Sequence, residues 1–478
     1  MEIVDEKDKV AVAQGQFHTS SGSDAEHIKS DSSNILQGPV DFKSVAAEPV
    51  DNIFSQGGNN YRTLRRKDTI LVMFTNQIGL GILSLPSILK TMGMVPGIIA
   101  LIGIGAMSWY TAYQLLQFYR RHPHVVNIVD MCRVVGGRPF EIAAGIMLMI
   151  QLLFTAASAV VTMSIAFNTL SDHATCTVTF ITVASLVCCM LGLPRTMKFV
   201  SLSGVPNAVS VIAAAMIVIV SLGVSGPVAA PDDWHREIKI VGNPTFSEGL
   251  TACLKIVFAY ASNMVFVTYM AEMVDPDKDF NYCLTWLEGG SMVFYTGIAI
   301  ILYCLGGEYT TSPILGTAAT IPAKVAYGVV LPAVTSTGMS IGHTGCKYVY
   351  VSIMRQRNAV DQLTANTFTS WSTWVFCVTS FWIITFIISN VIPIFDSILS
   401  ISSATTVGWL TYGFSAIFWL HSNWDAKFNG WKKTGVTVND LFINGAGLWA
   451  AVTGLIDSFN SEDSSISGVF SCGSNAQF

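Results

Sequence analysis

The stretch FTNQIGLGILSLP, residues 74–86, decides how this sequence folds. It lies inside a run apolar enough to cross a bilayer, yet it contains two carboxamides, two glycines and a proline. A helix interrupted by Gly79, Gly81 and Pro86 leaves backbone N–H and C=O groups unpaired, and a membrane tolerates this only where protein buries the irregular backbone or where it lines a cavity. The stretch therefore predicts a spanning helix with a break that is buried or faces a cavity.

The composition of the whole chain is typical of a membrane protein. Of its 478 residues, 51% are hydrophobic and 12% are charged. Apolar runs that meet or approach the spanning length of about 20 residues occur at eleven places. They are 69–90, 95–119, 140–170, 177–194, 200–225, 249–274, 283–306, 324–353, 371–393, 395–421 and 438–459. We therefore expect an all-helical integral membrane domain of eleven helices over residues 69–460.

The distribution of Lys and Arg predicts the orientation, because cytoplasmic loops collect positive charge. With the amino terminus in the cytosol, the inner segments hold sixteen Lys and Arg residues and the outer segments hold four. Residues 1–68 are polar and are expected to form a disordered cytosolic tail, and residues 461–478 a short tail on the outer side. Since the basic residues follow topology rather than forming a patch, no nucleic-acid partner is expected.

The break in the first span has the properties of a binding site. The amino terminus of a half-helix offers N–H groups and a positive dipole end to a carboxylate, and unwound carbonyls can hold a cation or an ammonium group. Asn76 and Gln77, just before the break, would add side-chain donors and acceptors. A glycine-lined helix contact with a proline kink is the alternative; the carboxamides and Ser84 favour a binding site over it.

Two other spans carry polar side chains at helical spacing. One stripe is Gln151, Thr155, Ser158 and Thr162, and the other is Ser336, Ser340, His343 and Lys347. A single hydroxyl in a membrane helix usually bonds to its own backbone. Four polar residues in register on each of two helices predict instead the wall of a polar cavity.

Ionisable residues within spans are functional candidates, because a buried charge is costly in a membrane. His343 lies near the midplane, about 15 Å from the inner end at 1.5 Å per residue, and an imidazole suits a proton relay. A neutral histidine hydrogen-bonded to a neighbour is the alternative. The other ionisable residues lie within about two turns of a predicted helix end, where they can reach the interface or a loop. They are Glu141, Lys255, Glu272, Glu288, Asp396 and Asp457.

The cysteines suggest at most one crosslink. Cys176 and Cys472 would both lie on the outer side and could pair, but the sequence does not show whether they are close. No cluster of Cys and His has the spacing of metal ligands. We therefore expect no metal and no other cofactor.

Three stretches resemble a known family. FAYASNMVFVTYMAEMVDP, 258–276, resembles the sixth-helix signature of the amino acid/auxin permease family of transmembrane amino acid transporters. NQIGLGILSLP, 76–86, resembles its first helix, and VDMCRVVGGRPFEI, 129–142, resembles its loop into the third helix. The resemblance covers about residues 69–460 and is greatest to fungal neutral amino acid permeases of the methyltryptophan-resistance type.

This resemblance implies a fold and a function. The fold would be of the leucine-transporter type, with helices 1–5 and 6–10 as inverted repeats, one extra helix, and helices 1 and 6 broken at the midplane. The function would be proton-coupled symport of neutral amino acids across the plasma membrane by alternating access, with the vacuolar membrane as an alternative. The coupling ion would be H⁺ rather than Na⁺. The oligomeric state stays open.

The resemblance also implies roles for particular residues. The substrate carboxylate would meet the backbone at Gly79, Leu80 and Gly81, and the ammonium group would meet carbonyls near 259–262 and hydroxyls of the eighth helix. The other expected substrate-site residues are Asn76, Phe154, Thr155, Phe258, Tyr260, Ser262, Asn263 and Ser340, and the ion site would include His343 and Thr344. The aromatic residues among them are equally suited to packing. Family members often carry Gly-His where this chain has Ser262 and Asn263, neither of which titrates.

Two other functional classes are compatible with many spans. A membrane-embedded acyltransferase or hydrolase would need a second catalytic Asp, Asn or Glu deep in a span, and the sequence places none there, so we expect no enzymatic activity. An amino acid sensor with a transporter fold would have the same pocket without flux.

A vacuolar exporter would have the same sequence features as an importer. Aromatic residues near the sixth-helix break favour large neutral substrates.

Overall fold

The computed structural model describes residues 64–195, 204–231, 234–357, 359, 362, 366–392, 394–422 and 469–475. All of them belong to one structural unit, Asp51–Phe478. Of the tail expected over residues 1–68, residues 1–63 lie outside the described residues, and so does the expected span at 438–459. A helix begins at Arg66, so the expectation of disorder is wrong for residues 66–68. The count of eleven spans is therefore not established by the structure.

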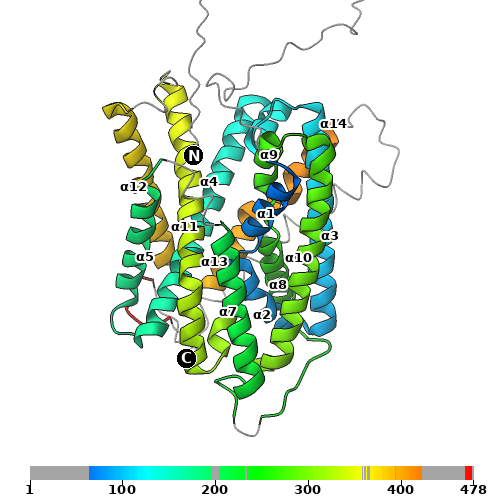
Figure 1. The fold of residues 1–478 in the computed structure, drawn as a ribbon, viewed down its shortest axis with the longest axis vertical. Helices are drawn as coiled ribbons and strands as arrows, with labels where there is room; N and C mark the ends of the chain where they lie inside the picture. Colours follow the sequence, from blue (N-terminus) through cyan, green and yellow to red (C-terminus); the bar gives the residue numbers. More distant parts are fainter. Residues whose placement is uncertain are drawn as a thin grey trace, which may run out of the picture. The chain divides into compact units, whose positions relative to one another are not determined.

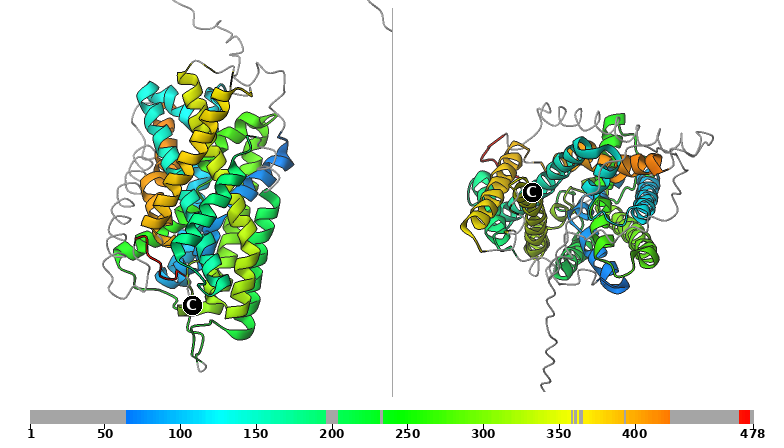
Figure 2. Two further views of the ribbon diagram at one scale, coloured as in Figure 1. Left: turned by 90° about the vertical axis from the view of Figure 1, so that its left-hand side faces the viewer. Right: turned by 90° about the horizontal axis from the view of Figure 1, so that it is seen from above.

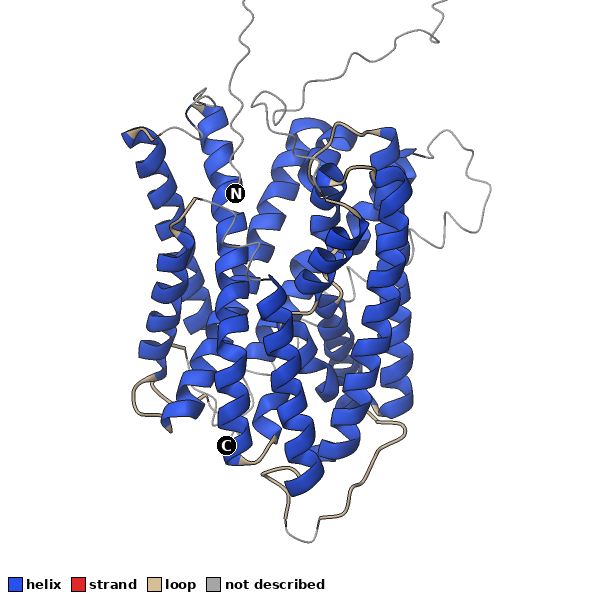
Figure 3. Cartoon of the chain, viewed as in Figure 1, coloured by secondary structure: helices blue, strands red, loops and turns tan. Residues whose placement is uncertain are grey.

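The described part of the chain is helical and contains no strand, as Figure 3 shows. The α-helices are α1 (Arg66–Gln77), α2 (Leu85–Met92), α3 (Met94–Arg121), α4 (Ile128–Ser171), α5 (Thr177–Gly192), α7 (Gly204–Ser225), α8 (Phe246–Ala259), α9 (Asn263–Glu272), α10 (Pro276–Gly306), α11 (Thr320–Gln356), α12 (Phe368–Val391), α13 (Phe395–Ser402) and α14 (Phe414–Ser422). Short 3₁₀ turns are η2 (Leu80–Ser84), η3 (Gly307–Tyr309) and η4 (Ile314–Thr317), and π-helical stretches are η6 (Ser403–Val407) and η7 (Trp409–Gly413).

Seven described helical segments are long and apolar enough to cross a membrane. They are α3, α4, α7, α8 with α9, α10 with η3, α11 and α12. The two halves of the first predicted span, Arg66–Gln77 and Gly81–Met92, form an eighth candidate bent by 46°. The expected span at 177–194 is the shorter apolar helix α5. The expected span at 395–421 is a chain of α13, η6, η7 and α14 rather than one regular helix.

Local sequence signals explain where several helices begin. The Asp275 side chain accepts a hydrogen bond from the Lys278 N–H, and Pro276 follows in the first turn, where its missing N–H costs nothing. Thr245 and Glu248 form a capping box at the start of α8. These caps set the lengths of α8 and α10, which carry most of the site described below.

Figures 1 and 2 show the described helices packed together in one bundle. They enclose two hydrophobic clusters, and each predicted broken span divides between these clusters. Leu85 of α2 and Ile256 of α8 belong to the first cluster. Met73 of α1 and Phe266 of α9 belong to the second. The breaks in the two spans therefore lie where one hydrophobic cluster gives way to the other.

Large apolar side chains also cover the outside of the helices. Val224 of α7, Val293 of α10 and Phe368 of α12 are all more than three-quarters exposed. Apolar exposure on this scale is unfavourable in water but suits contact with lipid. The described helices therefore have the surface of an integral membrane protein.

A disulfide joins Cys176, before α5, to Cys472. The carboxyl-terminal segment 469–475 is fixed beside it by hydrogen bonds from Thr177 Oγ1 to the Gly473 carbonyl at 2.6 Å and from Asn475 Nδ2 to Ser164 Oγ at 2.7 Å. The two cysteines that the sequence left open as partners are thus bonded.

Candidate functional site

The first span is interrupted between α1 and the turn η2. Helix α1 ends at Gln77, the Gly79 N–H bonds to the Gln77 carbonyl at 2.9 Å, and the 3₁₀ turn begins at Leu80. Gly79 has an extended backbone. Pro86 lies in the first turn of α2, where it cannot donate to the preceding turn. The residues that made this stretch unusual in the sequence are the ones that separate α1 from α2.

The sixth predicted span is interrupted in the same way. Helix α8 ends at Ala259 and α9 begins at Asn263. Between them the Ser262 N–H turns back to the Tyr260 carbonyl at 2.9 Å, which replaces the helical bonding pattern. Three residues, 260–262, therefore form an irregular segment inside an otherwise apolar span.

The two interruptions lie against each other. A Cβ atom on Gly81 would be 2.9 Å from Ala259 Cα, so only glycine allows this approach. The Tyr295 hydroxyl of α10 donates to the Gln77 carbonyl at 2.6 Å and lies 3.4 Å from the Ala259 carbonyl. Helix α10 thus holds the carbonyl ends of α1 and α8 together at one buried point.

Backbone hydrogen bonds tie matching halves of the two interrupted spans. At one end of the site, the Leu64 N–H donates to the Glu272 carbonyl and the Val274 N–H donates to the Leu64 carbonyl, both at 3.1 Å. At the other end, the Gly242 N–H, shortly before α8, donates to the Met92 carbonyl at the end of α2 at 2.8 Å. Helices α1 and α9 are thus joined at one end of the site, and α2 and α8 at the other.

The residues expected near the sixth-helix break are buried around it. Tyr260 is fully buried, with its ring 5.3 Å from that of Tyr295, and Phe258 is nearly buried. The Asn263 amide donates to Thr111 Oγ1 of α3 at 2.9 Å. Ser262 is also buried, whereas Asn76 is exposed and its amide donates to the Tyr269 hydroxyl of α9. Asn76 therefore connects the half-helices α1 and α9 rather than pointing into the break.

The polar stripe on α4 contacts another helix. Gln151 Oε1 accepts hydrogen bonds at 2.6 Å from Ser402 of α13 and from Thr406 of η6. The hydroxyls of Thr155, Ser158 and Thr162 bond to carbonyls of α4 itself. Phe154 and Thr155 remain partly exposed. Gln151 alone of the stripe thus holds the irregular α13–η6 segment against α4 through these described bonds.

The stripe on α11 lies elsewhere in the fold. The His343 ring packs against Trp374 of α12, with ring centroids 5.3 Å apart, and lies close to the backbone of Pro194 and Arg195 after α5. Thr344 is exposed, and its hydroxyl bonds to the Ser340 carbonyl at 2.9 Å. The described contacts of His343 are with α12 and the end of α5, and none joins it to the break near Gly79.

Sequence reasoning missed a buried acid beside the break. Glu288 of α10 was expected to reach the interface, but that expectation is wrong: its side chain is fully buried. The Gln77 carboxamide lies within interaction range of this carboxyl, but among the described residues neither group makes a hydrogen bond of standard geometry. Glu288, Ser291 and Tyr295 fall at i, i+3 and i+7, one face of a helix. That spacing was the sequence signal that could have revealed it.

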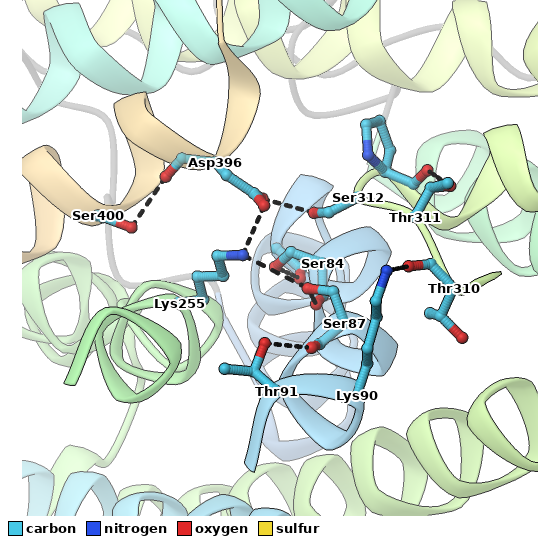
Figure 4. Close-up of polar contacts among 12 residues, drawn as sticks. Ser84, Ser87, Lys90, Thr91, Lys255, Thr310, Thr311, Ser312, Asp396 and Ser400 are labelled. Atoms are coloured by element: carbon cyan, nitrogen blue, oxygen red, sulfur yellow. Dashed lines mark hydrogen bonds and ion pairs between the residues drawn. The ribbon is translucent and has the colours of Figure 1, made fainter. Parts of the chain in front are cut away.

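An ion pair between α8 and α13 lies beside α2 (Figure 4). Lys255 Nζ of α8 lies 2.5 Å from Asp396 Oδ2 of α13 and 3.4 Å from Ser87 Oγ of α2. The Ser312 hydroxyl, in the segment before η4, donates to Asp396 Oδ1 at 2.5 Å. The sequence placed Lys255 and Asp396 at an interface or loop; the structure pairs them. Their contacts join four segments of the chain above the interruptions.

Comparison with known proteins agrees with this arrangement. The profile of a family described as "Transmembrane amino acid transporter protein" matches residues 63–459. A relative from Neurospora crassa, named "N amino acid transport system protein", is 29% identical over 434 residues, which cover 87% of this chain and 90% of the relative. A "Transmembrane transporter" from Fusarium pseudograminearum is 26% identical over 459 residues, 92% of each chain.

Among solved structures, the fold is similar to one described as "Inward facing conformation of Mhp1". The TM-score is 0.52 at 14% sequence identity, and the match covers 84% of this chain and 91% of that one. The likeness is to a fold of the leucine-transporter type. It extends over most of both chains.

Proposed function

Because this chain belongs to the family of transmembrane amino acid transporters, we propose that it is a secondary active transporter that carries neutral amino acids together with protons by alternating access. Family membership makes it an integral membrane transporter rather than an enzyme. The proposal adds the substrate class, the coupling ion and the mechanism. The observation that carries it is the contact between the two helix interruptions, where Gly81 meets Ala259 and Tyr295 bridges both.

The interruptions supply both kinds of group that a zwitterionic amino acid needs. A carboxylate would be held by the N–H groups at Gly79, Leu80 and Gly81 and by the dipole of the half-helix that follows. An ammonium group would be held by carbonyls of residues 259–262. Phe258 and Tyr260 would shape the pocket for the substrate side chain, and their buried apolar surface favours large neutral substrates.

The tied half-helices support an alternating-access mechanism. Helices α1 and α9 share bonds on the inner side, and α2 shares them with the segment leading into α8 on the outer side. Hinging at residues 78–79 and 260–262 would let one pair move relative to the other. The Lys255–Asp396 pair would then be the contact that closes the outer path.

The described contacts also support eleven spans with the amino terminus in the cytosol. The Ser422 carbonyl accepts a hydrogen bond from Arg121, near the start of α4, whereas Cys472 is bonded to Cys176, near the end of α4. The residues on either side of 423–468 therefore lie at opposite ends of a membrane-spanning helix. This placement supports the predicted eleventh span, and we place the carboxyl terminus outside the plasma membrane.

The disulfide allows a direct test of this orientation, because disulfides persist in oxidising compartments and are reduced in the cytosol. We expect an impermeant reductant added outside intact cells to make Cys176 and Cys472 reactive to a thiol-specific label. The eight other cysteines of the described part are free, so the test uses a variant in which each of them is serine. Labelling only after the cells are permeabilised would contradict the plasma-membrane orientation and favour an internal membrane.

The function itself is tested by uptake into proteoliposomes containing the purified chain. We expect a mixture of labelled neutral amino acids to accumulate when an inward pH gradient is applied without sodium, and not to accumulate when the pH is equal on both sides. Accumulation with sodium alone would replace the proton as coupling ion. Binding without any flux would contradict transport and favour a sensor with a transporter fold.

A further inference from the structure

We propose that Glu288 is the group that binds the transported proton, and that Gln77 links its protonation to the substrate site. This inference rests on the proposed function, because it names the proton site of the same transport cycle. It differs from the expectation that the sequence raised for His343, which lies against α12.

Among the described residues, no cation compensates the charge of Glu288. Its side chain is fully buried, and none of the ion pairs among the described residues includes it. The titratable groups that face it are the phenols of Tyr260 from the end of α8, Tyr295 from α10 and Tyr412 from η7. Helices α1, α2, α3, α7 and α9 also pack on α10, and within the described part they bring no Lys, Arg, His, Asp or Glu to this carboxyl.

A carboxylate in such surroundings is unfavourable. Removing an ion from water costs several kcal/mol even after the protein relaxes, and here no opposite charge offsets that cost. The closed arrangement is therefore stabilised when a proton binds a carboxylate oxygen and makes the group neutral. When the site opens, water can solvate the carboxylate, which lowers the free energy of the charged form, and the proton can leave. Protonation and closure thus favour each other.

Gln77 gives the proton a connection to the substrate site. Among the described residues, the amide of Gln77 has a donor and an acceptor without a partner of standard geometry, and a protonated Glu288 carboxyl has one of each as well. A carboxylic acid and a primary amide can exchange two hydrogen bonds, O–H to Gln77 Oε1 and Nε2–H to the carboxyl oxygen. A carboxylate has no O–H to donate, so within this pair it leaves Gln77 Oε1 without a donor. Protonation supplies that donor and lets the pair satisfy all four of its polar atoms.

The position of Gln77 makes this pairing relevant to transport. It is the last residue of α1, and its carbonyl is the one that Tyr295 holds next to the Ala259 carbonyl. The residues proposed to bind the substrate carboxylate begin two positions later, at Gly79. A movement that binds substrate at the break therefore also moves the partner of the protonated carboxyl. Loading of proton and substrate would be coupled through this one residue.

The test compares two activities of the Glu288→Gln variant in proteoliposomes, with the neutral amino acid that wild type accumulates most. Glutamine is neutral and similar in shape to protonated Glu, so we expect exchange of labelled for unlabelled substrate at equal pH to stay near the wild-type rate. Accumulation driven by an inward gradient of one pH unit, which at one proton per substrate can reach about tenfold, should fall to about onefold. Substrate-induced acidification, read by a trapped pH dye, should disappear.

Controls separate this proposal from simpler effects. Glu272→Gln removes an exposed acid of α9 and should behave as wild type in all three measurements. Glu288→Asp keeps a titratable group and should retain accumulation with a changed pH dependence. His343→Gln should retain accumulation as well.

Several outcomes would overturn the assignment while leaving the proposed function intact. One is wild-type accumulation by Glu288→Gln, and another is loss of accumulation in His343→Gln alone. Loss of exchange in both Glu288→Gln and Glu288→Asp would assign the residue to folding or substrate binding instead. Failure of the wild-type protein to accumulate substrate on a proton gradient, with exchange present, would instead remove proton coupling from the proposed function.

Discussion

Replacing Gly81 by valine is expected to abolish uptake without preventing the protein from folding. Any Cβ at this position would lie 2.9 Å from Ala259 Cα, a backbone atom that cannot rotate away. The α1–α2 interruption would have to move away from the α8–α9 interruption, and the N–H groups and carbonyls proposed to hold the substrate would no longer converge. A displacement of about 1 Å can cost about 100-fold in activity, and we expect a loss of at least that size.

The measurement is the initial rate of gradient-driven uptake in proteoliposomes, with the midpoint of thermal unfolding in detergent as the test of folding. Gly81→Ala adds only the Cβ and should cause a smaller loss. Gly103→Ala on α3 is the matched control, because a Cβ there would meet nothing within 4 Å. Uptake by Gly81→Val at the wild-type rate would show that the contact between the interruptions does not form the substrate site.

Removal of Asp396 is expected to destabilise the protein more than removal of any exposed charge. The Lys255 side chain is only 11% exposed, and in Asp396→Ala its ammonium group would be left without an anion. Breaking a buried pair in this way costs about 3–5 kcal/mol. Because the Asp396 side chain itself is 30% exposed, we expect a value near the lower end of that range. The Ser312 hydroxyl would lose its acceptor as well.

Denaturation in detergent would measure this loss. Lys324→Ala is the matched control, because Lys324 pairs with Asp172, whose side chain is largely exposed. Such an exposed pair stabilises a fold by about 0–1 kcal/mol. The double variant Lys255→Met/Asp396→Leu removes both charges and should recover most of the stability, because no unpaired charge remains. If Asp396→Ala were no less stable than the control, the ion pair would not be holding α8 and α13 together.

The sequence predicted the spans because hydrophobic length is a local property. The expected spans at 95–119 and 324–353 correspond to α3 and α11, and the residues that looked unusual at 74–86 are those that separate α1 from α2. The regularity of the 395–421 span could not be predicted in the same way. Its two π-helical stretches accompany hydrogen bonds from Ser402 and Thr406 to Gln151, a residue far away in the sequence.

The site was harder to predict because it depends on which helix faces contact each other in the folded protein. Glu288 seemed close to a helix end because the apolar run begins at residue 283. Helix α10 actually begins at Pro276, which places Glu288 about 18 Å along the helix at 1.5 Å per residue. The partners of Lys255 and His343 likewise come from distant segments, Asp396 and Trp374. Periodicity indicates a polar face but not the helix that it contacts.

The bonds of Leu64 and Gly242 also limit how many parts of this protein can move independently. Four half-helices could in principle respond separately to substrate, but Leu64 bonds to both sides of Met273, and Gly242 to Met92. The four half-helices should therefore move as two rigid pairs, α1 with α9 and α2 with α8, which meet at Tyr295. The distance between two spin labels should stay constant throughout the cycle when both labels are on one pair. When the labels are on different pairs, the distance should change with every opening and closing.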